Sequence, residues 1–155
     1  MGLNKKRIWL GAFVGSVVWF FWSFLTSQLL IGTARYTAAQ QAGQFLTQPR
    51  YPFFVGQWFV ILFIASVILA HVYAWSRSTM GPGPMTALKI GLLVGFVGGF
   101  PGNFAQATWG PFDRMFPLGW MLDIWGGCVI ATLIAGALYK QKEEAPKSAM
   151  AASGH

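Results

Sequence analysis

The chain has 155 residues, of which 55% are hydrophobic, 17% aromatic and only 10% charged, whereas about 25% of the residues of a soluble domain are charged. This composition excludes an ordinary water-soluble domain, and the length suits one membrane domain with four spans of roughly 20 residues each. The net charge of +7 does not indicate a nucleic-acid partner, because Lys and Arg fall in short segments between apolar runs and form no single patch.

The first apolar run covers residues 8–32 and directly follows the basic cluster Lys5, Lys6 and Arg7. It contains no charged residue, and it exceeds the roughly 20 residues that cross the hydrocarbon core of a bilayer. A cleaved signal peptide is the competing interpretation, but its apolar region would have only about 7–15 residues. The run therefore predicts a retained membrane span.

A polar loop, residues 34–52, separates this span from a second apolar run, residues 53–76. Three side chains could tether the loop to the bilayer surface: Tyr36, Phe45 and Leu46. A short segment, residues 77–85, follows the second run and contains the sequence GPGP. It predicts a tight turn, because Pro blocks helix continuation and Gly permits a positive φ.

The third apolar run, residues 87–108, contains the segment GFPGNFAQ, in which Pro101 removes one helical hydrogen bond. This segment predicts either a kinked or broken helix end beside polar groups, or a plain proline kink that serves packing. The fourth run covers residues 118–139, and the tail, residues 140–155, is too polar to fold alone and is expected to be disordered. The sequence thus predicts an all-α fold with one four-helix transmembrane domain at residues 1–139.

The basic residues predict the direction of the spans. With both termini in the cytoplasm, eight Lys and Arg residues lie inside: Lys5, Lys6, Arg7, Arg77, Lys89, Lys140, Lys142 and Lys147. Only three lie outside: Arg35, Arg50 and Arg114. This distribution follows the positive-inside rule, and it makes a bacterial inner membrane the expected location.

The first and third runs resemble each other. GAFVGSVVWFFWSF, starting at Gly11, and GLLVGFVGGFPGNF, starting at Gly91, are identical at six of fourteen positions. The second and fourth runs match more weakly. Two parallel helical hairpins would leave this pattern, and chance similarity between apolar sequences is the alternative.

Every predicted span places polar side chains at a similar depth near the outer face. The candidate ligand-binding or ion-binding residues are Gln28, Gln57, Asn103, Gln106 and Asp123. An ionisable group below the membrane interface is costly and is usually turned inward and partnered. Asp123 is therefore either an acceptor for a proton, a cation or a polar ligand in a shallow outward-facing pocket, or a structural carboxylate that pairs with Arg114 or is capped by Asn103.

Small residues at four-residue spacing predict close helix packing, as small-xxx-small patterns do. These residues are Gly11, Gly15, Gly91, Gly95 and Gly99. His71 is expected to be a structural histidine, and Cys128 a small packing residue. Asp113 and Arg114 are adjacent in an outer loop and are expected to pair with each other or to remain solvated.

The sequence contains no nucleotide-binding loop, HExxH motif, close carboxylate pair or Ser-His-Asp set, so neither enzymatic activity nor a cofactor or metal is expected. Paired aromatic residues at positions 19–22, the glycine-rich third run and LDIWGG at residues 122–127 make residues 8–139 resemble small bacterial four-span membrane proteins of unknown function. This resemblance implies a four-helix membrane fold and nothing catalytic.

Two functions remain open at this stage. The first is a non-enzymatic membrane protein, either an accessory or assembly subunit or a binder of a small ligand or lipid at the outer face. The second is a small oligomeric transporter or channel with Asp123 as its coupling or selectivity group. The expected partners are the lipid bilayer and either another membrane protein or further copies of the chain.

Overall fold

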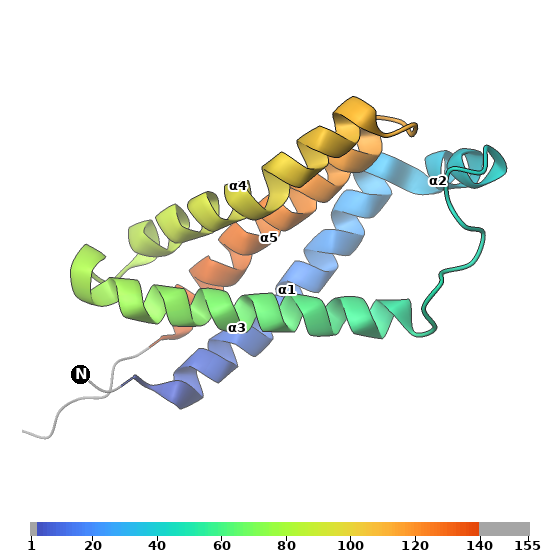
Figure 1. The fold of residues 1–155 in the computed structure, drawn as a ribbon. Coiled ribbons are helices and arrows are strands. Elements are labelled where there is room, and N and C mark those ends of the chain that lie inside the picture. The colour runs from blue at the N-terminus through green and yellow to red at the C-terminus, as the bar shows by residue number, and fades with distance from the viewer. Residues whose placement is uncertain (1–2, 140–155) are drawn as a thin grey trace, which may run out of the picture.

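The computed structural model describes residues 3–139 and consists of helices, as predicted (Figure 1). Four helices are long and apolar enough to cross a membrane. Their bounds are α1 Lys5–Thr26, extended by a π-helical turn η1 Ser27–Ile31, then α3 Phe54–Met80, α4 Pro84–Trp109 and α5 Met115–Leu138. A shorter helix, α2 Gly32–Gln41, lies between η1 and α3. The predicted tail, residues 140–155, lies outside the described residues.

The bounds of the four long helices agree closely with those of the predicted apolar runs, because the length of an apolar run determines the length of the span. The signals that begin and end the helices also come from residues close to those ends. The Asn4 side chain accepts a hydrogen bond from the Arg7 backbone N–H and so caps the start of α1. Between α3 and α4, Gly81 and Gly83 have φ angles of 82° and 128°, and Pro84 occupies the first turn of α4. The GPGP segment is thus the predicted tight turn.

Helix α5 is the centre of the bundle. It packs against α1, α3 and α4, whereas α1 and α4 do not pack against each other in the described part of the chain. The Asn4 N–H donates to the Tyr139 hydroxyl over 3.3 Å, so both ends of the described chain lie at the same end of the bundle. Toward its own N-terminal end, α3 diverges from the other three long helices, and residues 42–53 bridge the gap (Figure 1).

The five predicted packing glycines all lie against α5. A Cβ atom placed on Gly91 would be 2.6 Å from Cα of Val129, and one on Gly11 would be 3.0 Å from Cα of Ala135. The corresponding neighbours of Gly15, Gly95 and Gly99 are Ala131, Trp125 and Met121. Backbones therefore approach closely on both sides of α5, as expected where small residues line a helix interface.

The polar loop differs from expectation, because its first part is helical. The chain turns at Gly32, where φ is 73°, and continues as α2. The Arg35 guanidinium donates to the carbonyls of Leu30 and Ile31, where η1 joins α2. Tyr36 packs against Phe116 at the start of α5, so α2 is held by protein contacts.

Pro101 does not break the third span. Helix α4 continues through it to Trp109, so the broken form of GFPGNFAQ is not what the structure shows. Proline removes one backbone donor, and the helical bonds on either side remain. The Asn103 amide donates to the Gly99 carbonyl over 2.7 Å, which accounts for one polar side chain of this segment.

Candidate functional site

A pocket of about 680 Å³ lies where α3 diverges from the other helices. Every long helix contributes to its lining, together with η1, α2 and the loop after α2. The lining residues are Phe20, Ser23, Phe24, Ser27, Tyr36, Phe45, Phe54, Val55, Trp58, Asn103, Trp120, Asp123 and Ile124. Its volume lies within the range of about 300–1,000 Å³ that is typical of sites for small molecules.

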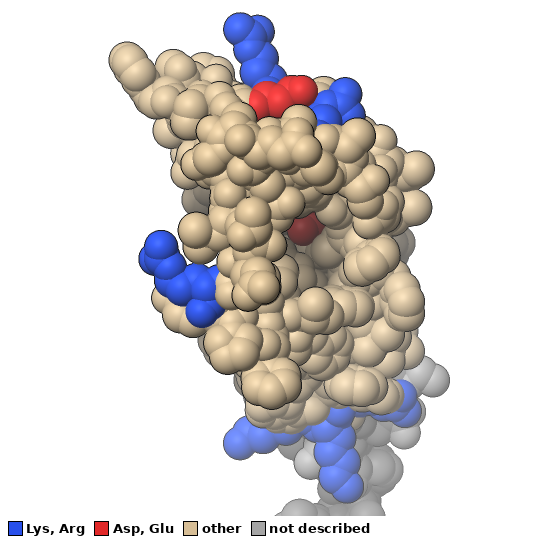
Figure 2. All heavy atoms as spheres, turned by 90° about the vertical axis from the view of Figure 1, so that its right-hand side faces the viewer, with Lys and Arg blue, Asp and Glu red and all other residues tan. Residues whose placement is uncertain are grey.

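Asp123 lies deep in this pocket. The residue is 8% exposed, and an acidic group is visible inside the hollow in Figure 2. Two donors from α1 reach the same oxygen, Oδ1: the Ser23 hydroxyl at 2.6 Å and the Trp19 indole N–H at 3.2 Å. The Trp58 indole N–H in turn donates to the Ser23 hydroxyl over 3.5 Å. Asp123 is therefore held by a hydrogen-bond network that joins α1, α3 and α5.

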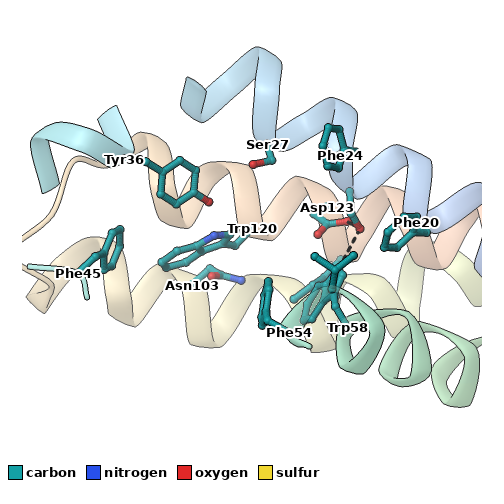
Figure 3. Close-up of a pocket in the computed structure, with 13 residues that line it drawn as sticks. Phe20, Phe24, Ser27, Tyr36, Phe45, Phe54, Trp58, Asn103, Trp120 and Asp123 are labelled. Carbon is teal, nitrogen blue, oxygen red and sulfur yellow. Dashed lines mark hydrogen bonds between the residues drawn. The ribbon is translucent and has the colours of Figure 1, made fainter. Parts of the chain in front are cut away.

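Asp123 has neither of the partners, Arg114 and Asn103, that were expected for a structural carboxylate. Asn103 donates to its own helix, and the described residues include no ion pair between Asp123 and Arg114. Both bonds to Asp123 fall on Oδ1, and no described residue donates to Oδ2. Figure 3 shows the carboxylate among Phe20, Phe24 and Trp58, and Asp123 is one of the residues that line the pocket.

A regular ladder between α1 and α5 brings these groups together. Each step moves four residues forward along α1 and four residues back along α5, so the pairs share one interface of two antiparallel helices. The pairs are Gly11 with Ala135, Gly15 with Ala131, Trp19 with Gly127, and Ser23 with Asp123. The ladder thus changes from close backbone packing to a polar contact at the level of the pocket.

Two glycines on α5 make room for the indoles of α1. The Trp19 ring lies directly against Gly127, where a Cβ atom would overlap it. The Trp22 ring lies against Gly126, where a Cβ atom would be 2.7 Å from Nε1, and its N–H donates to the Leu122 carbonyl. The LDIWGG segment therefore supplies both the carboxylate and the space for its donor.

Aromatic rings from α2, the loop after it and α5 line one side of the pocket. Phe45 packs edge-to-face on Phe116 with ring centroids 4.8 Å apart, and it also contacts Trp120 and Tyr36. These contacts seat Phe45 and Tyr36 on the start of α5. Leu46, the third predicted tether, is largely exposed. The loop is thus fixed over the pocket by a cluster of rings, as Figure 3 shows for Tyr36, Phe45 and Trp120.

The other predicted polar residues have different positions. Asn103 lines the pocket with Asp123. Gln28, Gln57 and Gln106 are exposed and are not among the lining residues. Sequence reasoning did not single out Trp19, Ser23 and Trp58 as site residues. The four-residue series Gly11, Gly15, Trp19, Ser23 on α1 was the signal that could have found the first two.

His71 and Cys128 lie away from the pocket. Nδ1 of His71 is 2.8 Å from the Val67 carbonyl of its own helix, which is the structural role expected for it. Cys128 is buried in the core, also as expected. Among residues 3–139, no three His, Cys, Asp or Glu side chains lie close enough together to hold a metal ion.

The exposed ion pair of Asp113 also differs from the prediction. Asp113 pairs with Arg35 of α2, at 3.2 Å between Oδ2 and Nε, and the expected partner was Arg114. The Met115 backbone N–H donates to Oδ1 of Asp113 over 2.9 Å. This bond, with a further contribution from Arg35, lowers the pKa of Asp113 below its ordinary value. Both side chains are about half exposed, so the pair contributes little to stability.

Comparison with models of known protein families, with curated proteins and with solved structures finds no match for this chain. The functional assignment therefore depends on the geometry of the pocket.

Proposed function

We propose that this chain is a non-enzymatic membrane protein that binds a small ligand or lipid in the pocket around Asp123. The observation that carries the proposal is a pocket of drug-sized volume, lined mainly by apolar and aromatic side chains, with one carboxylate held at its base. Sites for small molecules commonly combine apolar walls with a few fixed polar groups that set the orientation of the ligand.

The orientation in the membrane is part of the proposal. The positive-inside distribution of Lys and Arg supports an orientation with both termini on the cytoplasmic side of a bacterial inner membrane. The contact between Asn4 and Tyr139 supports it, because an even number of spans returns the chain to its starting side. The pocket then opens on the outer side, together with α2 and the loop before α5, which the Arg35–Asp113 pair joins. A ligand would reach it from that side or from the outer leaflet.

Three further points stay predictions. The resemblance to small bacterial four-span proteins is one, and the internal repeat of two helical hairpins is another. The third is what the protein does with a ligand in the pocket. It acts either as an accessory subunit with a membrane-protein partner or as a homo-oligomeric transporter. Below the pocket, Trp19, Leu62 and Leu69 belong to one packed core, which favours binding over passage through this protomer.

Native mass spectrometry of the protein extracted gently from its own membrane tests the proposal. Ser27 lines the pocket and its hydroxyl makes no hydrogen bond with the described residues, so Ser27→Trp should fill the pocket without removing a side-chain hydrogen bond. The neighbouring Gln28 is exposed and outside the pocket, and Gln28→Trp is the matched control.

The expected result is a small molecule or lipid that is bound at one copy to the wild type and to the control, and is lost from Ser27→Trp. Equal adducts on all three proteins, or none on the wild type, would overturn the proposal. The same spectra report any stoichiometric protein partner and the number of copies of the chain.

A further inference from the structure

The charge inside the pocket is not balanced by the protein. Of the described residues that line it, Asp123 alone carries a formal charge. Its two hydrogen-bond donors, Ser23 and Trp19, are neutral. Arg35, the basic residue of α2, is engaged with Asp113 and with backbone carbonyls. A carboxylate at membrane depth is usually paired, so its partner is expected to come from the ligand.

The free oxygen determines what that partner must offer. Because Ser23 and Trp19 both donate to Oδ1, their bonds fix the carboxylate and leave Oδ2 as an acceptor. An ionised carboxylate accepts hydrogen bonds and donates none. A ligand group with an N–H or O–H donor therefore fits this position, and a positively charged donor fits best because charge-assisted hydrogen bonds are the stronger ones.

The aromatic rings around Asp123 also favour a positively charged ligand. Figure 3 shows Phe20, Phe24 and Trp58 beside the carboxylate, with Trp120 and Phe54 farther along the pocket. Aromatic faces attract an organic cation through their quadrupoles, and the attraction increases when the cation is shielded from water. The same rings offer an apolar surface to the body of a ligand.

We propose that the pocket binds a lipophilic organic amine, whose ammonium group donates to Oδ2 of Asp123 between Trp58 and the phenylalanines of α1, and whose apolar body lies along Phe54 and Trp120. This ligand class rests on the proposed binding function and narrows it. Asp123 supplies the charge recognition, and the rings supply most of the contact area.

The test compares an amine with its neutral isostere. The purified full chain, in nanodiscs of zwitterionic lipid, is titrated with 4-phenylbutylamine and with 4-phenylbutanol by isothermal calorimetry at pH 7. Asp123→Asn removes the charge and retains the size of the side chain. Asp113→Asn removes the same charge from the exposed ion pair outside the pocket, so it is the matched control. Asp123→Glu retains the charge if Asp123→Asn does not fold.

We expect the wild type and Asp113→Asn to bind the amine at least tenfold more tightly than the alcohol. Asp123→Asn should lose that preference, and Asp123→Glu should keep part of it. Equal binding of amine and alcohol by the wild type, or an amine preference that survives in Asp123→Asn, would overturn the inference while the small-ligand function stands. Failure of the small-ligand function appears separately, as the absence of an adduct that Ser27→Trp removes.

Discussion

The indole of Trp19 lies directly on Gly127, and its N–H reaches Oδ1 of Asp123 one helical turn away. Gly127 and Asp123 are four residues apart on α5 and therefore share a face of the helix. The absence of a side chain at one position thus allows the ring to donate to the other. This relationship makes a glycine part of the geometry of the pocket.

Replacing this glycine should disturb both packing and the site. In Gly127→Ala the new methyl group overlaps the Trp19 ring, so the ring or the helix must move and the bond to Asp123 is lost or lengthened. Overpacking of this kind costs about 1–3 kcal/mol. Thermal unfolding in nanodiscs should show a lower Tm. Gly102→Ala is the control, since a Cβ atom there meets nothing within 4 Å, and its Tm should be unchanged or higher.

Removal of the shorter donor to Asp123 should also be destabilising. Ser23→Ala deletes the 2.6 Å hydrogen bond and leaves Trp19 as the donor to Oδ1. Hydrogen bonds to charged groups contribute about 1.5–3 kcal/mol. Ser16, another buried serine of α1, donates to the Phe13 carbonyl in its own helix, so Ser16→Ala should cost less. Equal losses of Tm in the two variants would show that the carboxylate does not depend on Ser23.

How much of this structure the sequence predicts depends on how far apart along the chain the interacting residues lie. The four spans follow from the lengths of the apolar runs, and the α3–α4 turn follows from Gly and Pro. Helix α2 does not follow from local signals, because Arg35 and Tyr36 stabilise it through contacts with η1 and α5. The partner of Asp113 does not follow from local signals either, because Asp113 pairs with Arg35, 78 residues away along the chain, and not with its neighbour Arg114.

The residues of the pocket show the same limit, because contacts between distant parts of the chain are not predicted from sequence. Asp123 could be identified from sequence because a lone carboxylate in an apolar run is costly. Its donors could not, because Ser23 and Trp19 lie 100 and 104 residues away along the chain. Gln28 was grouped with the site by depth alone. Successive side chains of a helix point in different directions, so Ser27 lines the pocket and Gln28 does not.

Loosening the loop over the pocket should be visible in solution. Phe45→Ala removes the ring that contacts Phe116 and Trp120. Residues 42–53 should then exchange backbone amide hydrogens faster and be cleaved sooner by a protease, because the ring cluster no longer holds them on α5. Leu46→Ala alters a mostly exposed neighbour and is the control. The same exchange rate in Phe45→Ala and the wild type would contradict the role of the ring cluster.

Acid should weaken the exposed ion pair between Asp113 and Arg35 in a defined pH range. The pKa of Asp113 is lowered in the folded protein, first by the Met115 N–H and also by Arg35. Its contribution to stability is therefore complete above the ordinary aspartate pKa of about 4 and is lost as the pH falls through the lower, folded value. Tm measured from pH 6 to pH 2 should decrease more for the wild type than for Asp113→Asn. Parallel curves would exclude this contribution.

The central position of α5 constrains how the protein is made. During synthesis α1, α3 and α4 all precede α5, and α1 and α4 do not pack against each other in the described structure. The growing chain can therefore form the α1–α3 hairpin early, but Trp19 and Ser23 wait for their acceptor until the span that carries Asp123 leaves the translocon. Assembly of the pocket is thus a late event of biogenesis, and a chain truncated before α5 would hold three spans without the helix that joins them.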